Sequence, residues 1–521
     1  MKGAIAAGHP LTAEAGARVL VEGGNAVDAC VAAAFASWVT ESPLTGPGAG
    51  GFMLVHRAGD RSTRLLDFFV AAPGRGLRDG ERREMEAVNV AFADGALQTF
   101  RIGAAACAVP GAVAGLAEAH RLYGRLPWAV LGAPAAELAR AGVELGPAQA
   151  FLHRVLDPIL RSGEEGRRIY GADRAPGVGA RISMDDLAGT LELLAGGGPD
   201  VFYRGELARR ISAHVLERGG RLTEEDLATY RVVRRRPVRA AFRGHVFVSN
   251  PPPSSGGVLI ALALRALDRL GPSPPRGSAE GTARLAELFG ETGRARDRAF
   301  SRALDRGGLA ARLLAEETVA ALAARVAAGA SRHVSEPTAL PSTTHISVAD
   351  AEGNAVSMSA STGSGSGVVV PGTGVHLNNT LGEEDLNPYG VEARPGRRLT
   401  SMMAPSVVLR GGRPRLVVGS AGSERLRAAI LQIVLNVVDH GLAVGEAIAA
   451  PRLHLDGSRL HLEGGFPAET ADELETLGYE VVRWRELNLY FGGAACVLVD
   501  DAGELSAAGD PRRGGVGIVV E

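Results

Sequence analysis

Hydrophobic residues recur at helical spacing from Thr12 to Trp38, and this pattern predicts two helices near the start of the chain. The pair Gly23-Gly24 ends the first helix, and Asn25 is placed to cap the second. The segment TGPGAGGF, residues 45–52, lacks the lysine and the following helix that a phosphate-binding loop needs. It therefore predicts a tight backbone turn that leads into strands over 53–57 and 64–69.

The pattern from Pro110 to about Leu270 indicates a largely helical region, in which PPPSSGG at 251–257 forms a rigid loop before an apolar helix over 258–270. After Pro341 the pattern changes to short strands, predicted over 344–348, 355–361, 406–410, 415–419, 496–500 and 504–508, with a buried helix over 426–438. In the second of these strands apolar residues alternate with serines, so one face is apolar and the other carries hydroxyls. The order of helices and strands predicts an α+β layered sandwich, with helices outside two sheets.

Composition supports a single globular unit. The chain has 521 residues, of which 46% are hydrophobic and 22% charged, so neither disorder nor a membrane protein is indicated. The net charge of −2 argues against nucleic-acid binding as the main role. The apolar helix over 27–39 is too short to span a bilayer and carries Asp28. The sequence as given begins without a sustained apolar signal region, so we expect a cytoplasmic protein, or a periplasmic or secreted one if a signal has been removed.

The amino acids that are scarce exclude several chemistries. Lys2 is the only lysine, so the chain has no phosphate-loop lysine and no Schiff-base lysine for pyridoxal phosphate. The 12 histidines show no His-Glu-x-x-His motif, and Cys30, Cys107 and Cys496 are too scattered for a zinc cluster or a disulfide framework. We expect neither a metal nor a cofactor, and we expect the cysteines to be small buried side chains.

The segment PSTTHISVADAEGNAV, residues 341–356, raises a chemical question. A threonine at the start of a strand is ordinarily only a good strand former. Cleavage of the Ser342-Thr343 bond would give Thr343 a second role, because its freed α-amine would titrate near ~7.7 to 8.0. That amine could accept the proton of the hydroxyl on the same residue, so one residue would supply both nucleophile and base.

At this point the sequence resembles the gamma-glutamyltranspeptidases, a family of N-terminal nucleophile (Ntn) hydrolases. The resemblance covers nearly the whole chain and is carried by ordered motifs, which include GGNAVDACVAAAF (23–35), AVPGAVAGLAEAH (108–120), LTEEDLATYR (222–231), PPPSSGG (251–257), TTHISVADAEGNAVS (343–357), GVHLNN (374–379), GSAG (419–422) and GDPRRGG (509–515).

The resemblance implies a four-layer αββα sandwich made as one precursor. The precursor would cleave itself between Ser342 and Thr343 into a large subunit, 1–342, and a small subunit, 343–521, which remain associated. Thr343 would be the nucleophile, Ser361 would supply the hydroxyl that assists its amine, and Gly422 and Ser423 would provide the oxyanion donors. The substrate would be a small amide, and water or an amine would accept the acyl group.

The sequence departs from the family where substrate is bound. Where the family has an arginine that grips the α-carboxylate of a γ-glutamyl group, LDFFVAAP has Phe69, and a pair of family serines becomes Ser401 and Met402. The family residues that hold the α-amine correspond to Thr380 and Glu383, with Glu384 and Asp385 as neighbouring candidates, and Arg75 is an alternative carboxylate contact.

Three functions follow from these comparisons. The first is a self-processing threonine amidohydrolase or acyltransferase that acts on a γ-glutamyl-like or related amide. The second is an acylase for another acyl group, because Phe69 replaces the arginine. The third belongs to a different class, an uncleaved and inactive scaffold in which Thr343 is only a strand residue.

Overall fold

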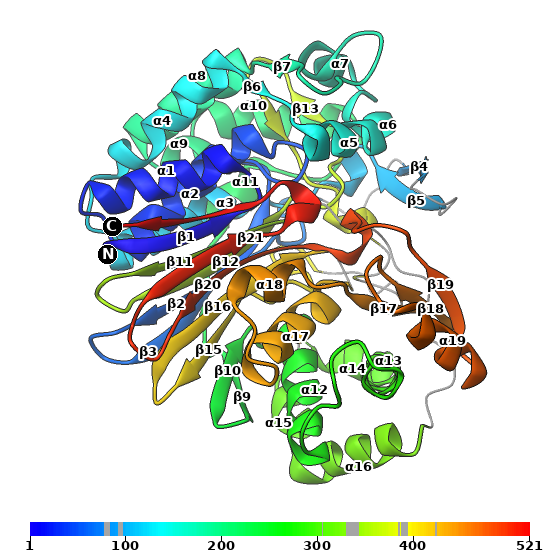
Figure 1. The fold of residues 1–521 in the computed structure, drawn as a ribbon. Helices are drawn as coiled ribbons and strands as arrows, with labels where there is room; N and C mark the ends of the chain where they lie inside the picture. Colours follow the sequence, from blue (N-terminus) through cyan, green and yellow to red (C-terminus); the bar gives the residue numbers. More distant parts are fainter. Residues whose placement is uncertain are drawn as a thin grey trace.

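Two β-sheets lie face to face, and helices cover the outer face of each (Figure 1). This computed structural model describes residues 1–77, 84–91, 97–304, 306–329, 343–383, 386, 394–422 and 425–521. From top to bottom of Figure 1 the layers are helix, sheet, sheet and helix. The predicted four-layer αββα sandwich is confirmed.

The first sheet is antiparallel throughout and has the strand order β22-β1-β11-β12-β2-β3-β8. Its strands are β1 (Gly3–Ala7), β2 (Gly50–Arg57), β3 (Ser62–Phe68), β8 (Val233–Arg235), β11 (Thr344–Asp350), β12 (Ala355–Ser361) and β22 (Val516–Val520). Asp350, the last residue of β11, pairs with Gly3 near the N-terminus. The first residue of β11 therefore lies at the opposite end of the sheet from the N-terminus.

The second sheet has the order β21-β20-β16-β15-β10-β9. Its strands are β9 (Val238–Phe242), β10 (His245–Ser249), β15 (Ser406–Arg410), β16 (Arg413–Ala421), β20 (Gly493–Val499) and β21 (Leu505–Gly509). The predicted hairpins over 406–419 and 496–508 are confirmed, with β16 beginning at Arg413.

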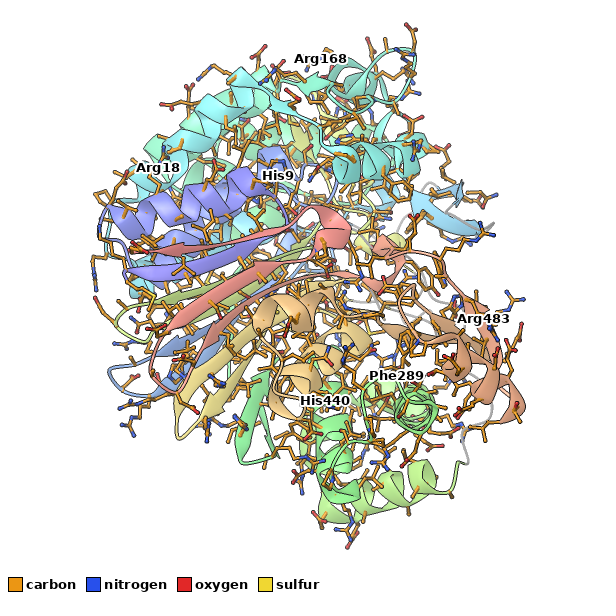
Figure 2. All side chains as sticks on the ribbon, in the orientation of Figure 1. His9, Arg18, Arg168, Phe289, His440 and Arg483 are labelled. Carbon is orange, nitrogen blue, oxygen red and sulfur yellow. The ribbon has the colours of Figure 1, made fainter. Side chains whose placement is uncertain are left out.

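The first sheet is covered by helices from the first half of the chain: α1 (Pro10–Val21), α2 (Ala26–Thr40), α3 (Ala112–Tyr123), α4 (Trp128–Ala141), α5 (Pro147–Val155), α6 (Asp157–Leu160), α7 (Glu164–Tyr170), α8 (Asp185–Gly197), α9 (Asp200–Tyr203), α10 (Glu206–Glu217) and α11 (Glu224–Thr229). Asn25 caps α2 as predicted, through a capping box with Asp28. Exposed arginines such as Arg18 and Arg168 lie on the outside of this layer (Figure 2).

The second sheet is covered by α12 (Gly256–Leu270), α13 (Ala279–Arg294), α14 (Arg298–Ala303), α15 (Leu309–Leu313), α16 (Glu316–Ala327), α17 (Arg425–Val438) and α18 (Val444–Ala449). A small sheet beside it contains β17 (Leu453–Asp456), β18 (Arg459–Leu462) and β19 (Glu480–Arg483), packed with α19 (Ala468–Thr476). Three two-stranded sheets are also present: β4 (Glu86–Ala91) with β5 (Leu97–Ile102), β6 (Val143–Glu144) with β7 (Arg181–Ile182), and β13 (Val369–Val370) with β14 (Val375–His376).

The two faces of β12 differ as the sequence predicted. Val356, Met358 and Ala360 join the apolar core between the first sheet and its helices. The serines point toward the second sheet, where the Ser357 hydroxyl donates to the carbonyl of Val418 at 3.1 Å and accepts from the amide of Ser406 at 2.9 Å. The hydroxyl face therefore ties the two sheets together.

One prediction of secondary structure is wrong in part. The stretch from Pro110 to Leu270 contains helices, but it also supplies β8, β9 and β10. The run RVVRRRPVRAAF, 231–242, is rich in arginine because it contains β8 and β9, which are edge strands of the first and the second sheet, and their exposed side chains reach solvent.

Candidate active site

Thr343 directly precedes β11, and only 3% of its surface is exposed. In the β11–β12 ladder Thr344 pairs with Ala360. Continuing this antiparallel register by one residue puts Thr343 opposite Ser361, and opposite residues direct their side chains to the same face. The structure therefore brings these two predicted site residues together.

Ser361 connects Thr343 to the predicted substrate site. Its hydroxyl accepts a hydrogen bond from the amide of Gly363 at 2.8 Å. The carboxylate of Glu383 lies against the same glycine, since a Cβ added to Gly363 would come within 2.4 Å of Glu383 Oε1. Thr380 is buried in the turn that ends at Glu383. Glu383 thus lies near Ser361, where its carboxylate could bind an amine.

A buried pair of charged residues, which the sequence did not predict as site residues, lies under Thr343. The guanidinium of Arg513 donates to the main-chain carbonyl of Thr343. Glu41, which directly follows α2, accepts a hydrogen bond from the hydroxyl of Thr344 at 2.7 Å. Burial raises the pKa of Glu41, while Thr344 and Arg513 oppose that shift. Burial also lowers the pKa of Arg513, opposed by Glu41 and Asp510.

The motif GDPRRGG was the sequence signal for Arg513. Other residues of this motif form buried ion pairs. Asp510 forms ion pairs with Arg452 at 2.7 Å and Arg512 at 3.0 Å. Arg512 also pairs with Glu463. These contacts fix the turn that presents Arg513 to the nucleophile.

His345 has a structural place between the sheets. Its Nδ1 lies 2.8 Å from the Ser359 hydroxyl, and its Nε2 lies 3.0 Å from the Ser347 hydroxyl. Burial lowers the pKa of His345 to about 3, so the ring is neutral at physiological pH. The ring packs on Gly419, where an added Cβ would lie 2.1 Å from Cε1. His345 therefore joins β11 to β16.

Gly422 lies beyond the end of β16, at the same end of the sandwich as Thr343. The side chain of Arg513 connects the two, because it bonds to Thr343 and packs on Gly493, which pairs with Ala421. Gly422 has φ 130°, a conformation that favours glycine. Its carbonyl accepts from the amide of Arg425 at 2.9 Å, where α17 begins. A turn that leads into a helix N-terminus provides a positive potential suited to an oxyanion.

Ser401 and Met402 are held by the loop PPPSSGG. The carbonyl of Ser401 accepts from the amide of Ser255 at 2.8 Å, and the Ser255 hydroxyl lies 3.0 Å from the Met402 sulfur. Both residues are 3% exposed. The hydroxyl of Ser401 accepts from the amide of Met403 at 3.1 Å. The loop 251–257 therefore fixes the segment that contains Ser401 and Met402. This role explains why the loop has a rigid, proline-rich sequence.

Phe69 is buried between the two sheets. Its ring stacks on Phe52 with the centroids 5.5 Å apart. Met402 belongs to a different apolar cluster, between the second sheet and its helices. Arg398 bonds to the carbonyl of Phe69 and forms an ion pair with Asp67 at 3.2 Å. It is held by the protein itself and is not a replacement for the missing arginine.

Some predicted residues lie outside the described residues, namely Ser342, Ser423, Glu384 and Asp385. Arg75 is described, and its guanidinium packs against Gly396. Within the described ranges, no group of three or more His, Cys, Asp or Glu side chains is placed to hold a metal ion. No helix in the described part of the chain is long and apolar enough to cross a bilayer. All three cysteines are free and buried, as predicted.

A two-sheet sandwich with a buried threonine at the head of a central strand, a second hydroxyl opposite it and a glycine turn beside it defines an Ntn hydrolase. The gamma-glutamyltranspeptidase family model matches residues 12–520. The chain therefore belongs to the gamma-glutamyltranspeptidase family, and it is a self-processing amidohydrolase or acyltransferase.

Relatives within the family have two kinds of name. The chain is 32% identical to the acylase ACY 1 proenzyme of Pseudomonas sp. (strain V22), over 100% of this chain and 94% of the relative. It is also 32% identical to the glutathione hydrolase proenzyme of Escherichia coli (strain K12), over 98% of this chain and 90% of the relative. The crystal structure of cephalosporin acylase from Bacillus halodurans superposes with a TM-score of 0.85 at 27% identity, covering 100% of this chain and 96% of that one.

Proposed function

We propose that Thr343 is both the nucleophile that cleaves the precursor and the nucleophile that attacks the amide substrate. The observation that carries this proposal is the placement of Thr343, buried at the head of β11 and opposite Ser361. A threonine hydroxyl needs an adjacent base, and His345 is unsuitable because its pKa of about 3 reflects a buried ring whose nitrogens already face serines. In the mature enzyme, the α-amine that cleavage frees on Thr343 is the proposed base.

Maturation would proceed by attack of the Thr343 hydroxyl on the carbonyl carbon of Ser342. The peptide C–N bond breaks as the C–O bond forms, and the amine takes a proton. Water then hydrolyses the resulting ester, which leaves a carboxylate on Ser342 and a free amine on Thr343. The products are the large subunit, 1–342, and the small subunit, 343–521.

We expect the two subunits to stay together. In the first sheet β1, β2, β3 and β8 come from the large subunit and β11, β12 and β22 from the small one. In the second sheet β9 and β10 come from the large subunit. Separation would expose paired strand edges and the apolar cores between layers, which is unfavourable.

In the mature enzyme the Thr343 amine would take the hydroxyl proton while the oxygen attacks the substrate carbonyl. The amide nitrogen leaves as an amine after receiving that proton, and an acyl ester remains on Thr343. The backbone amides of Gly422 and Ser423 are the proposed oxyanion donors, and Ser361 the hydroxyl that orients the amine. Water or an acceptor amine then takes the acyl group and releases the enzyme.

The proposed acyl donor is a γ-glutamyl-like or related amide. Glu383, beside Gly363 and Ser361, would bind an α-amine with its carboxylate, with Thr380 next to it. Ser401 would contact the carboxylate end of the donor. The glutathione hydrolase name of one relative supports this donor class.

A second candidate is an acyl group without an amino-acid carboxylate. The observation that favours it is Phe69, which is stacked on Phe52 in the place where the family resemblance implies an arginine. Losing a bidentate arginine contact would cost a carboxylate-bearing donor on the order of 2 to 5 kcal/mol. Acylase names among the relatives also support this candidate.

The test is a panel of p-nitroanilides that carry γ-glutamyl, glutaryl, succinyl and unbranched acyl groups, assayed with wild type, Thr343→Ala and Thr343→Ser. We expect Thr343→Ala to lose turnover of every compound and Thr343→Ser, the matched control that keeps the hydroxyl, to retain part of it. A preference for the γ-glutamyl compound over the unbranched acyl compounds, which carry no carboxylate, supports the first candidate, and the reverse order supports the second. Retained turnover in Thr343→Ala would refute the proposal.

A further inference from the structure

Arg513 is a charged side chain that contacts Thr343 directly. Only 8% of it is exposed, and its guanidinium donates to the carbonyl of Thr343. Its aliphatic stem passes over Gly493, where an added Cβ would lie 2.2 Å from Arg513 Cδ. The stem therefore runs through a gap that only a glycine at 493 leaves open, so the position of the guanidinium is fixed by packing as well as by its hydrogen bond.

Glu41 provides a carboxyl group at the next residue, Thr344. It is 5% exposed, and its Oε2 accepts from Thr344 Oγ1 while its Oε1 lies 3.4 Å from Thr12 Oγ1. Gly8 leaves room for the carboxylate, since a Cβ there would come within 2.5 Å of Oε2. Arginine does not lose its proton in this pH range, and the Arg513 charge, like the hydrogen bond from Thr344, opposes the rise that burial gives to the pKa of Glu41 and so favours the ionised carboxylate.

The remaining titratable groups around Thr343 are accounted for. His345 is neutral, because burial lowers its pKa to about 3. Asp510 is engaged by Arg452 and Arg512, and Glu383 lies beyond Ser361 on the substrate side. Within the described part of the chain, Arg513 and Glu41 are therefore the charged groups that contact Thr343 and its neighbour Thr344.

We propose that Arg513 is a positioning residue that anchors Thr343 by its carbonyl and, balanced by Glu41, sets the protonation of the α-amine that serves as base. The inference rests on the proposed function, since the amine exists only after cleavage before Thr343. The amine and the carbonyl oxygen belong to one residue, so the Arg513 charge lies within about 6 Å of the amine. A positive charge at that range disfavours the ammonium form, and a negative charge favours it.

The two charges therefore have opposite effects on the acid limb of the rate profile. Removing the positive charge in Arg513→Gln stabilises the ammonium form, so the limb moves to higher pH. Removing the negative charge in Glu41→Gln destabilises the ammonium form, so the limb moves to lower pH. We expect each shift to be about one pH unit, a tenfold change in proton affinity.

The experiment measures kcat against pH for the mature wild type, Arg513→Gln, Arg513→Lys, Glu41→Gln and Arg410→Gln. Arg513→Lys keeps the charge and should leave the limb near its wild-type position. Arg410→Gln removes an exposed arginine paired with Asp501, far from the site, and should also leave it unchanged. A purely structural role would lower kcat at every pH without moving the limb.

The inference is overturned if Arg513→Gln and Glu41→Gln leave the limb in place or move it in the same direction. If Arg513→Gln does not mature, the downward shift expected for Glu41→Gln decides alone. A small subunit that starts elsewhere than Thr343, or an active Thr343→Ala enzyme, would refute the proposed function instead. Unmoved limbs in a correctly cleaved and active enzyme refute only the role of Arg513.

Discussion

The contact between His345 and Gly419 makes a quantitative prediction about the junction of the two sheets. A methyl group at 419 would lie 2.1 Å from Cε1, 2.4 Å from Nδ1 and 2.6 Å from Nε2 of His345. The ring cannot turn aside, because both nitrogens face the buried hydroxyls of Ser359 and Ser347. Gly419→Ala therefore forces β16 and β11 apart two residues from Thr343.

The expected cost has two parts. Overpacking in a well-packed interior costs about 1 to 3 kcal/mol. Each buried hydroxyl that loses its imidazole partner adds about 1 to 3 kcal/mol. We expect a total of about 3 to 5 kcal/mol, because partial relaxation preserves some of these contacts. For 521 residues the unfolding entropy is about 1.1 kcal/mol/K, so Tm should fall by about 3 to 5 K.

Calorimetry of the mature enzyme measures this change, with Gly445→Ala as the matched control. Gly445 is an exposed residue of α18, and an added Cβ meets nothing within 4 Å. That variant should equal or exceed wild type by up to about 1 kcal/mol. If Gly419→Ala is as stable and as active as Gly445→Ala, the proposed fixed contact between His345 and β16 is refuted.

Three further predictions concern binding, specificity and acid stability. Glu383→Gln should raise KM about 10- to 100-fold for donors with an α-amine and leave amine-free donors unchanged, and equal effects on both would contradict its assignment. Phe69→Arg should lower stability by about 3 to 5 kcal/mol, because it buries an uncompensated charge beside Phe52. The control Phe69→Leu should cost under about 1.5 kcal/mol. A stable Phe69→Arg enzyme with improved γ-glutamyl turnover would contradict the buried placement of Phe69. Burial lowers the pKa of His345 to about 3 and that of His153 to about 4, so protons bind the unfolded chain preferentially. The stability from these two neutral rings is fully present above about pH 6.5, and below that pH each ring loses up to about 1.4 kcal/mol of it per pH unit. Denaturant titrations at pH 7 and pH 5 would detect the difference.

Local sequence patterns predicted much of the fold. The alternation in 355–361 predicted both the strand and its two faces, because a strand places successive side chains on opposite sides. Asn25 after a glycine pair predicted the start of α2, because the capping interaction lies within four residues. The edge strands β8 and β9 were missed, since their arginine-rich pattern is set by exposure at the sheet edges and not by propensity.

The site shows the same limit. Thr343, Ser361 and Gly422 follow from motifs, and the structure brings them to one end of the sandwich. Arg513 and Glu41 come from opposite ends of the chain, so no local pattern could have paired them across Thr343. Phe69 follows the last residue of β3, where the alternation ends, and the sequence could not show that its ring stacks on Phe52.

The N-terminal sequence of the smaller fragment of the purified wild-type protein tests the central claim most directly. Denaturing electrophoresis should separate two fragments, and the smaller should begin Thr343-Thr344-His345, with Thr343→Ala remaining one intact chain. A single uncleaved wild-type band, as the inactive scaffold requires, or a fragment that begins at another residue, would contradict the account.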